Sequence, residues 1–168
     1  MLEAFAAALL LGGINTLADF ILSELKLAAR PIYVFARIVL ICYCVGGIVG
    51  ARARQLMIGT IGGLMLGALV GCAHYLLAPA MGLGALAVAW ALFWIGFSLL
   101  DAVFRGASGM VGALLQGLLA AAVSGVLFYA LTSIWAPPTG GEPNLLRVLA
   151  LWVGAFFPGF IVLFWHRL

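Results

Sequence analysis

Residues 59–74 read GTIGGLMLGALVGCAH, and this stretch decides how we expect the chain to fold. Its glycines recur at every fourth residue, at Gly59, Gly63, Gly67 and Gly71. On a helix such residues lie above one another and form a bare stripe. Each glycine costs roughly 0.8–1 kcal/mol against alanine in a helix, so four in register indicate close packing against another helix, as in membrane proteins. The run ends at an ionisable residue, His74.

The composition around this stretch is that of a membrane protein. Of the 168 residues, 67% are hydrophobic and only 8% are charged, whereas a soluble domain carries about 25% charged residues. A spanning helix needs ~20 apolar residues, which limits the chain to about six crossings. The apolar runs do not alternate with polar residues, as the strands of a membrane barrel do. We therefore predict an all-α polytopic membrane protein, with residues 1–168 forming a single six-helix domain.

Turn signals divide the chain into six predicted spans. The strongest signal is APPTGGEPN at residues 136–144, and a second is Ala78-Pro79. The fifth span repeats the small-residue stripe between Gly109 and Gly125. The predicted spans cover about residues 4–23, 32–48, 56–77, 83–104, 108–135 and 145–165.

The charges indicate an orientation rather than a charged partner. The net charge of +3 is spread over several connections, so no basic patch predicts nucleic-acid binding. Because basic residues favour the cytoplasmic side, the bias is weakly towards both termini being cytoplasmic. With both termini inside, the cytoplasmic side carries four basic residues, Arg52, Arg54, Arg105 and Arg167. The opposite side then carries three, Lys26, Arg30 and Arg147. A preference for Arg over Lys, with abundant Ala and Gly, suggests a bacterial plasma membrane.

Catalytic and metal-binding motifs are nearly absent. The sequence has no HExxH, GxSxG or phosphate-binding glycine loop. Cys42, Cys44 and Cys72 form no CxxC pair, and we interpret them as packing residues. We therefore predict no metal and no cofactor, and we rank an enzyme last among the functions.

Polar residues inside the spans are the candidate ligand-binding groups. Ionisable residues at membrane depth are costly, which makes each one a functional candidate. Asp19 and Arg37 lie on consecutive spans and either form an ion pair or extend separately towards the nearby surface. Asn15 and Thr16 either line a cavity or hydrogen-bond to a neighbouring helix.

The remaining candidates each have a structural alternative. Gln116 lies beside the second small-residue stripe and would otherwise join two helices, while Tyr129 would anchor a span end. His74 either titrates near neutral pH or hydrogen-bonds to a loop carbonyl. Asp101 pairs with Arg105 one turn later, or holds a loop, or meets a partner protein.

The order of several short motifs resembles the insulin-induced gene (Insig) family, whose members are six-span sterol sensors. The resemblance covers the chain from about residue 63 onwards. The matching motifs are Val70-Gly71-Cys72-Ala73-His74, Asp101 followed by Arg105 and Ser108-Gly109, Val126-Leu127-Phe128-Tyr129, Leu146-Arg147, and Phe156-Phe157-Pro158-Gly159.

The resemblance implies a non-enzymatic lipid sensor whose six helices enclose a central cavity. It also implies that spans three and four contact partner membrane proteins and that Asp101 takes part in this contact. The family's polar positions near the sterol correspond to Gly84 and Val88, which offer no side-chain hydrogen bond. An apolar two-tailed lipid such as a diacylglycerol would therefore suit this chain better than a sterol.

We thus expect a protein that binds a diacylglycerol-like or sterol-like membrane lipid without catalysis. The predicted ligand-binding residues are Asn15, Thr16, Asp19, Arg37, His74, Gln116 and Tyr129. We also expect a homo-oligomer, with a trimer as one option, formed through spans three and four along Gly59, Gly63, Gly67 and Gly71. The main alternative is a small transporter or permease subunit that uses Asp19 and Arg37, and a lipid-modifying membrane enzyme comes third.

Overall fold

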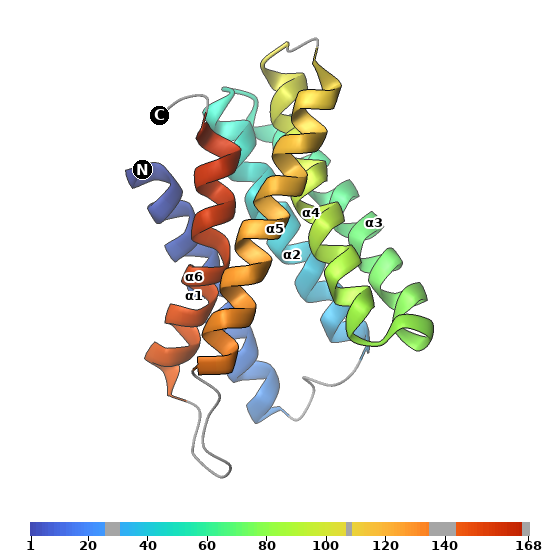
Figure 1. The fold of residues 1–168 in the computed structure, drawn as a ribbon, viewed down its shortest axis with the longest axis vertical. Helices are drawn as coiled ribbons and strands as arrows, with labels where there is room; N and C mark the ends of the chain where they lie inside the picture. The colour runs from blue at the N-terminus through green and yellow to red at the C-terminus, as the bar shows by residue number, and fades with distance from the viewer. Residues whose placement is uncertain (26–30, 107–108, 135–143, 166–168) are drawn as a thin grey trace.

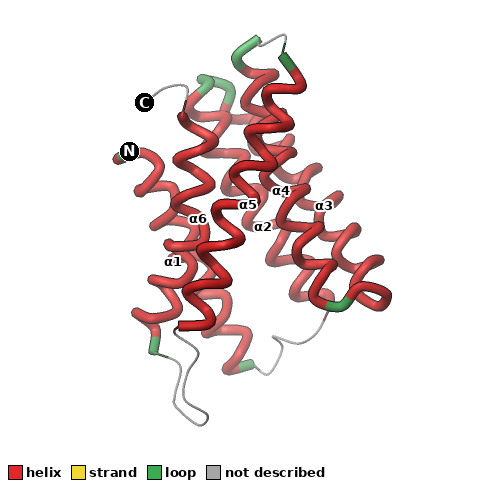
Figure 2. The backbone as a smooth tube through the Cα atoms, in the orientation of Figure 1, coloured by secondary structure: helices red, strands yellow, loops and turns green. Residues whose placement is uncertain are grey.

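Six apolar helices make up the regular structure of this protein. A computed structural model describes residues 1–25, 31–106, 109–134 and 144–165, and within these ranges the only regular elements are helices (Figure 2). Each helix is long and apolar enough to cross a membrane, which confirms the predicted all-α, six-span class. The bounds are α1 Leu2–Glu24, α2 Pro31–Arg52, α3 Leu56–Met81, α4 Leu83–Phe104, α5 Met110–Ile134 and α6 Leu145–Phe164.

Two helices run further than their predicted ends at residues 48 and 77. Helix α2 continues to Arg52 because its glycines, including Gly50, pack on α3 and do not loosen the helix. Helix α3 continues through Pro79, where we predicted a loop. It ends at Gly82, whose positive φ of 54° reverses the chain and whose N–H donates to the Ala78 carbonyl at 2.9 Å.

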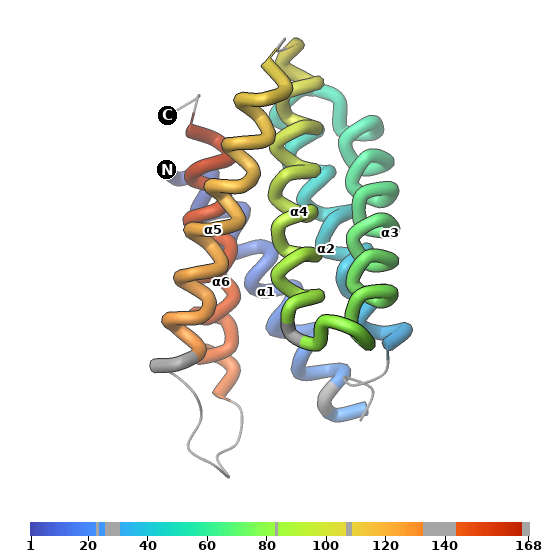
Figure 3. Tube along the Cα trace, turned by 45° about the vertical axis from the view of Figure 1, so that its right-hand side comes forward, coloured from blue at the N-terminus to red at the C-terminus, as the bar shows by residue number. Residues whose placement is uncertain are grey.

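Contacts between helices that follow one another in the sequence, together with an extensive contact between α1 and α6, hold the bundle together (Figure 1). Helix α1 packs extensively on α6, and α2 packs on α3. Helices α3, α4, α5 and α6 follow one another in contact, whereas α1 and α2 touch over a smaller area. Figure 3 shows α2 at the back of the bundle, between α1 and α3. The helices therefore surround a common interior.

The described basic residues near the helix ends lie at the ends of the bundle to which we assigned them from the sequence. The start of α1 and the end of α6 lie at the same end of the bundle (Figure 1). Arg52, Arg54 and Arg105 belong to connections at that end, and Arg147 begins α6 at the other. Lys26, Arg30, Ser108, Trp135 and Arg167, which also entered the predictions, lie outside the described residues.

Aromatic side chains from α4 and α6 fill the centre of the bundle. Trp94 is fully buried, with its ring centroid 5.1 Å from that of Phe93 and 5.4 Å from that of Phe160. Gly159 makes room for this indole, since a Cβ there would lie 2.6 Å from Trp94 Cε2. Helix α6 continues through Pro158, so the Pro158-Gly159 pair serves this close approach and does not end the helix.

The glycine stripe of residues 59–71 lies inside the chain. All four glycines are buried against α2. A Cβ on Gly63 would lie 2.9 Å from the Gly46 Cα, and one on Gly67 would lie 2.8 Å from the Val39 Cα. Our prediction that Gly59, Gly63, Gly67 and Gly71 form the seam between two protomers is therefore wrong: they form the α2–α3 interface of one chain, which leaves no room for a second copy. The spacing of the glycines did predict that this helix packs closely on another helix.

Candidate functional site

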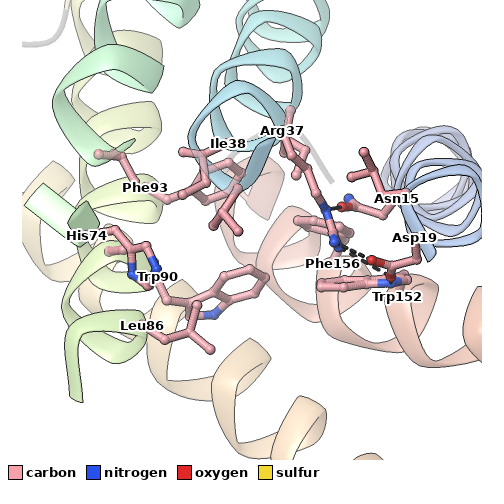
Figure 4. A pocket seen from close by; sticks show the side chains of 15 residues that line it. Asn15, Asp19, Arg37, Ile38, His74, Leu86, Trp90, Phe93, Trp152 and Phe156 are labelled. Atoms are coloured by element: carbon pink, nitrogen blue, oxygen red, sulfur yellow. Dashed lines mark hydrogen bonds and ion pairs between the residues drawn. The ribbon is translucent and has the colours of Figure 1, made fainter. Parts of the chain in front are cut away.

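A cavity of about 270 Å³ lies within the membrane-spanning part of the bundle (Figure 4). Residues of α1, α2, α3, α4 and α6 line it, its walls are mainly apolar, and it is partly open to the surroundings. The residues that line it are Asn15, Asp19, Leu22, Val34, Arg37, Ile38, Ile41, Val70, His74, Leu86, Ala89, Trp90, Phe93, Trp152 and Phe156. An apolar space with a few polar groups gathered on one wall is typical of sites for small amphiphilic ligands.

The polar wall is a hydrogen-bonded network centred on Asp19 and Arg37. Both guanidinium Nη atoms of Arg37 donate to the Asp19 carboxylate, one of them to Oδ2 at 3.3 Å. Arg37 Nε donates to Asn15 Oδ1 at 2.8 Å, and Trp152 Nε1 donates to Asp19 Oδ2 at 2.7 Å. The guanidinium carbon also lies 4.8 Å from the centre of the Trp152 ring, within cation–π range. The ion-pair alternative, rather than separate extension to the surface, is the one present in the structure.

Local sequence explains how three helices bring these groups together. Asn15 and Asp19 are four residues apart, so they lie on one face of α1. Gly12, one turn earlier, lets α6 approach, since a Cβ there would lie 2.6 Å from Val153 Cγ2. This close approach places the neighbouring Trp152 within reach of the Asp19 carboxylate. The network therefore depends on the α1–α6 contact as much as on its charges.

Arg37, which lines the cavity, keeps hydrogen-bonding capacity beyond this network. Arginine has five N–H groups, and Arg37 uses three of them with Asn15 and Asp19. Because the positive and negative charges of the pair cancel, the wall can hydrogen-bond to a ligand without demanding that the ligand be an ion. Arg37 is thus the group best placed to bind a polar head.

His74 and the aromatic residues form the opposite wall. Figure 4 shows His74 and Trp90 on one side of the space and Arg37 and Trp152 on the other. His74 Nδ1 is buried and has no hydrogen-bond partner among the described residues. Trp90 Nε1 donates to Ser124 Oγ at 2.8 Å, so its indole presents only its apolar body to the cavity. A buried unpaired nitrogen is costly, so His74 is suited to a ligand hydrogen bond.

Four of the seven predicted ligand-binding residues line this cavity: Asn15, Asp19, Arg37 and His74. The other three do not, and we correct their assignment. Thr16 points its hydroxyl back to the Gly12 carbonyl at 2.7 Å. Tyr129 is 76% exposed on the outer face of α5. Gln116 donates to the carbonyls of Val162 and Leu163, at 2.7 and 3.0 Å, in the last turn of α6.

Of the alternatives predicted for Asp101, the structure shows the pair with Arg105. Its side chain is only 3% exposed, and its Oδ2 accepts a hydrogen bond from Arg105 Nε at 2.7 Å. A carboxylate buried in this way at the end of α4 holds the chain as it leaves the helix. This burial contradicts the prediction that Asp101 is presented to a partner protein.

Sequence reasoning missed Trp90, Trp152 and Phe156 as site residues. Trp90 and Trp94 are four residues apart and so lie on one helix face, but this spacing does not distinguish a packing or lipid-facing residue from a cavity wall. Trp152 is 133 positions from Asp19, so only the packing of α6 on α1 shows that they meet. No cluster of three or more His, Cys, Asp or Glu that could hold a metal occurs in the part of the chain that the structure describes.

The six apolar helices define a multi-pass membrane protein with an intramembrane cavity. Comparison of the chain with protein-family models, with curated proteins and with solved structures finds no match.

Proposed function

We propose that this protein binds one amphiphilic lipid in its cavity and acts as a lipid sensor or regulator without catalysis. The observation that carries the proposal is the arrangement of the cavity walls. The polar head of the ligand would lie between Arg37 and His74, and its apolar part would pack on Trp90, Phe93 and Phe156.

The size of the cavity limits the ligand. The volume of about 270 Å³ falls just below the ~300–1,000 Å³ of sites for drug-sized ligands. One acyl chain segment with a small head fits this space better than both chains of a diacylglycerol. A single-chain lipid with hydroxyl groups, such as a monoacylglycerol, is therefore the ligand class that we favour, with a diacylglycerol inserting one chain.

The motif order shared with the Insig family supports a sensing role. His74 belongs both to the Insig-like motif of residues 70–74 and to the cavity wall. We further propose that the protein resides in a bacterial plasma membrane, on the preference for Arg over Lys with abundant Ala and Gly, and that both termini are cytoplasmic, on the charge bias. Self-association and contact with a partner membrane protein remain predictions, and they would use the exposed outer faces of α3 and α4 rather than the glycine stripe.

Two measurements test the proposal. Native mass spectrometry of the purified protein should detect a bound lipid. A monoacylglycerol with a nitroxide on its chain should quench tryptophan fluorescence by binding beside Trp90 and Trp152. Ala89→Leu narrows the cavity and should weaken this binding about tenfold, which corresponds to ~1.4 kcal/mol.

Ala87→Leu is the matched control, because Ala87 lies two residues away on α4 with its side chain exposed. This variant should bind like the wild type. The proposal would be contradicted if native mass spectrometry detects no bound lipid and if the labelled monoacylglycerol quenches the wild type and Ala89→Leu to the same extent.

The second candidate function, transport, is favoured by the ion pair in the cavity wall. Charged residues within membrane helices commonly mark the path of a polar substrate, and Asp19 and Arg37 both face the cavity. Flux of a small polar solute into liposomes that is lost in Asp19→Asn would favour transport. Lipid binding with no flux would favour the sensor.

A further inference from the structure

A second pocket of about 520 Å³ adjoins the cavity on the outer side of α2 and α3. Its walls include Pro31 and Phe35 of α2 and Gly71, Tyr75 and Pro79 of α3. We refer to it as the lateral pocket. Tyr75 and Pro79 are exposed at the surface of the bundle, so the lateral pocket opens outwards, close to the helix ends.

Two residues, Val34 and His74, line both the lateral pocket and the cavity. We refer to these two residues as the partition. The imidazole of His74 can change rotamer without moving the backbone, because exchange between staggered wells is a side-chain motion. Val34 is β-branched and lies in α2, where one χ1 rotamer is strongly preferred, so His74 is the movable part of the partition.

The partition offers a hydrogen-bonding group on an otherwise apolar path. His74 Nδ1, at the partition, has no partner among the described residues. A hydroxyl group could therefore hydrogen-bond to His74 before it reaches Arg37, which lines the cavity beyond.

We propose that the lateral pocket is the access site through which a single-chain, hydroxyl-bearing amphiphile enters the cavity, passing between Val34 and His74. This inference rests on the proposed lipid-binding function. It adds a second binding place and a route from the membrane surface to the first.

The test compares rate constants with affinity, using the nitroxide-labelled monoacylglycerol and stopped-flow tryptophan fluorescence in detergent micelles. Ala78→Trp fills the lateral pocket but does not touch the cavity lining. It should slow association and dissociation by the same factor, about tenfold, and leave the Kd unchanged. Ala68→Trp, on an exposed face of the same helix, lines neither space and should behave like the wild type.

Tyr75→Ala tests the proposal independently, since this exposed side chain can be removed without disturbing the core. It widens the lateral pocket and should accelerate both rate constants. Unchanged rate constants in Ala78→Trp and Tyr75→Ala, with wild-type affinity, would overturn the access site and leave the proposed function standing. Absence of quenching in the wild type would overturn both.

Discussion

Replacing Asp19 with leucine should destabilise the protein mainly through the groups it leaves behind. The Asp19 carboxylate accepts two hydrogen bonds from Arg37 and one from Trp152. In Asp19→Leu, the Arg37 guanidinium keeps only its bond to Asn15, and the Trp152 N–H loses its acceptor. An uncompensated charge then remains in the interior of a membrane-spanning bundle.

The size of the effect follows from the exposure of the pair. Removing one partner of a fully buried ion pair costs about 3–5 kcal/mol. Here the side chains of Arg37 and Asp19 are 21% and 35% exposed, which lowers the expected loss to about 2–3 kcal/mol. Arg37→Leu should cost a similar amount, since it strands the carboxylate. The double variant should cost no more than either single one, which gives a coupling energy of at least about 2–3 kcal/mol.

Reversible unfolding in mixed micelles, followed by the loss of helical circular dichroism as sodium dodecyl sulfate is added, measures these free energies. The Glu3–Arg52 ion pair supplies the control cycle. Its carboxylate side chain is 73% exposed, so the coupling between Glu3→Leu and Arg52→Leu should stay below about 1 kcal/mol. Additive effects of Asp19→Leu and Arg37→Leu, with a coupling below about 0.5 kcal/mol, would refute the reasoning.

Three further predictions test the packing. Gly63→Ala places a Cβ 2.9 Å from the Gly46 Cα and should lower the free energy of unfolding by about 1–3 kcal/mol. The control Gly13→Ala, whose Cβ would have nothing within 4 Å, should not lower it. The same micelle titration compares the two variants. Gln116→Leu should cost about 1 kcal/mol in that titration and leave monoacylglycerol binding unchanged, because its side chain joins α5 to α6 outside the cavity. A maleimide should modify the exposed Cys72 of the folded protein and spare the buried Cys42, as mass spectrometry would show; equal labelling would contradict the α2–α3 packing.

The sequence predicted the helices well because their signals are local. Apolar run length and the turn residues between runs determine where a membrane helix can form. Where the prediction was wrong, a tertiary contact outweighed the local signal. Gly50 stays helical because α3 packs on it, and Pro79 is tolerated within the last turn of α3.

The site was only partly predictable because its geometry depends on distant contacts. Charged and amide residues at membrane depth are conspicuous in a sequence, so Asn15, Asp19 and Arg37 could be found. Whether Gln116 faces a cavity or a helix end depends on how α5 is rotated against α6, and the weak hydrophobic periodicity of α5 does not encode that rotation. Trp152 is in the site only because Gly12 admits α6 to the surface of α1.

The glycine stripe and the cavity are linked through the geometry of α3. Val70 and His74 each follow a stripe glycine by three residues, so each side chain lies about 60° around the helix from that glycine. These glycines pack against α2, and Val70 and His74 line the cavity beside them. A Cβ on Gly71 would meet Phe35 Cδ2 at 2.7 Å, so the Phe35 ring next to Val34 would have to shift. Gly71 therefore sets how closely Phe35 packs on α3, beside the two residues that the cavity and the lateral pocket share.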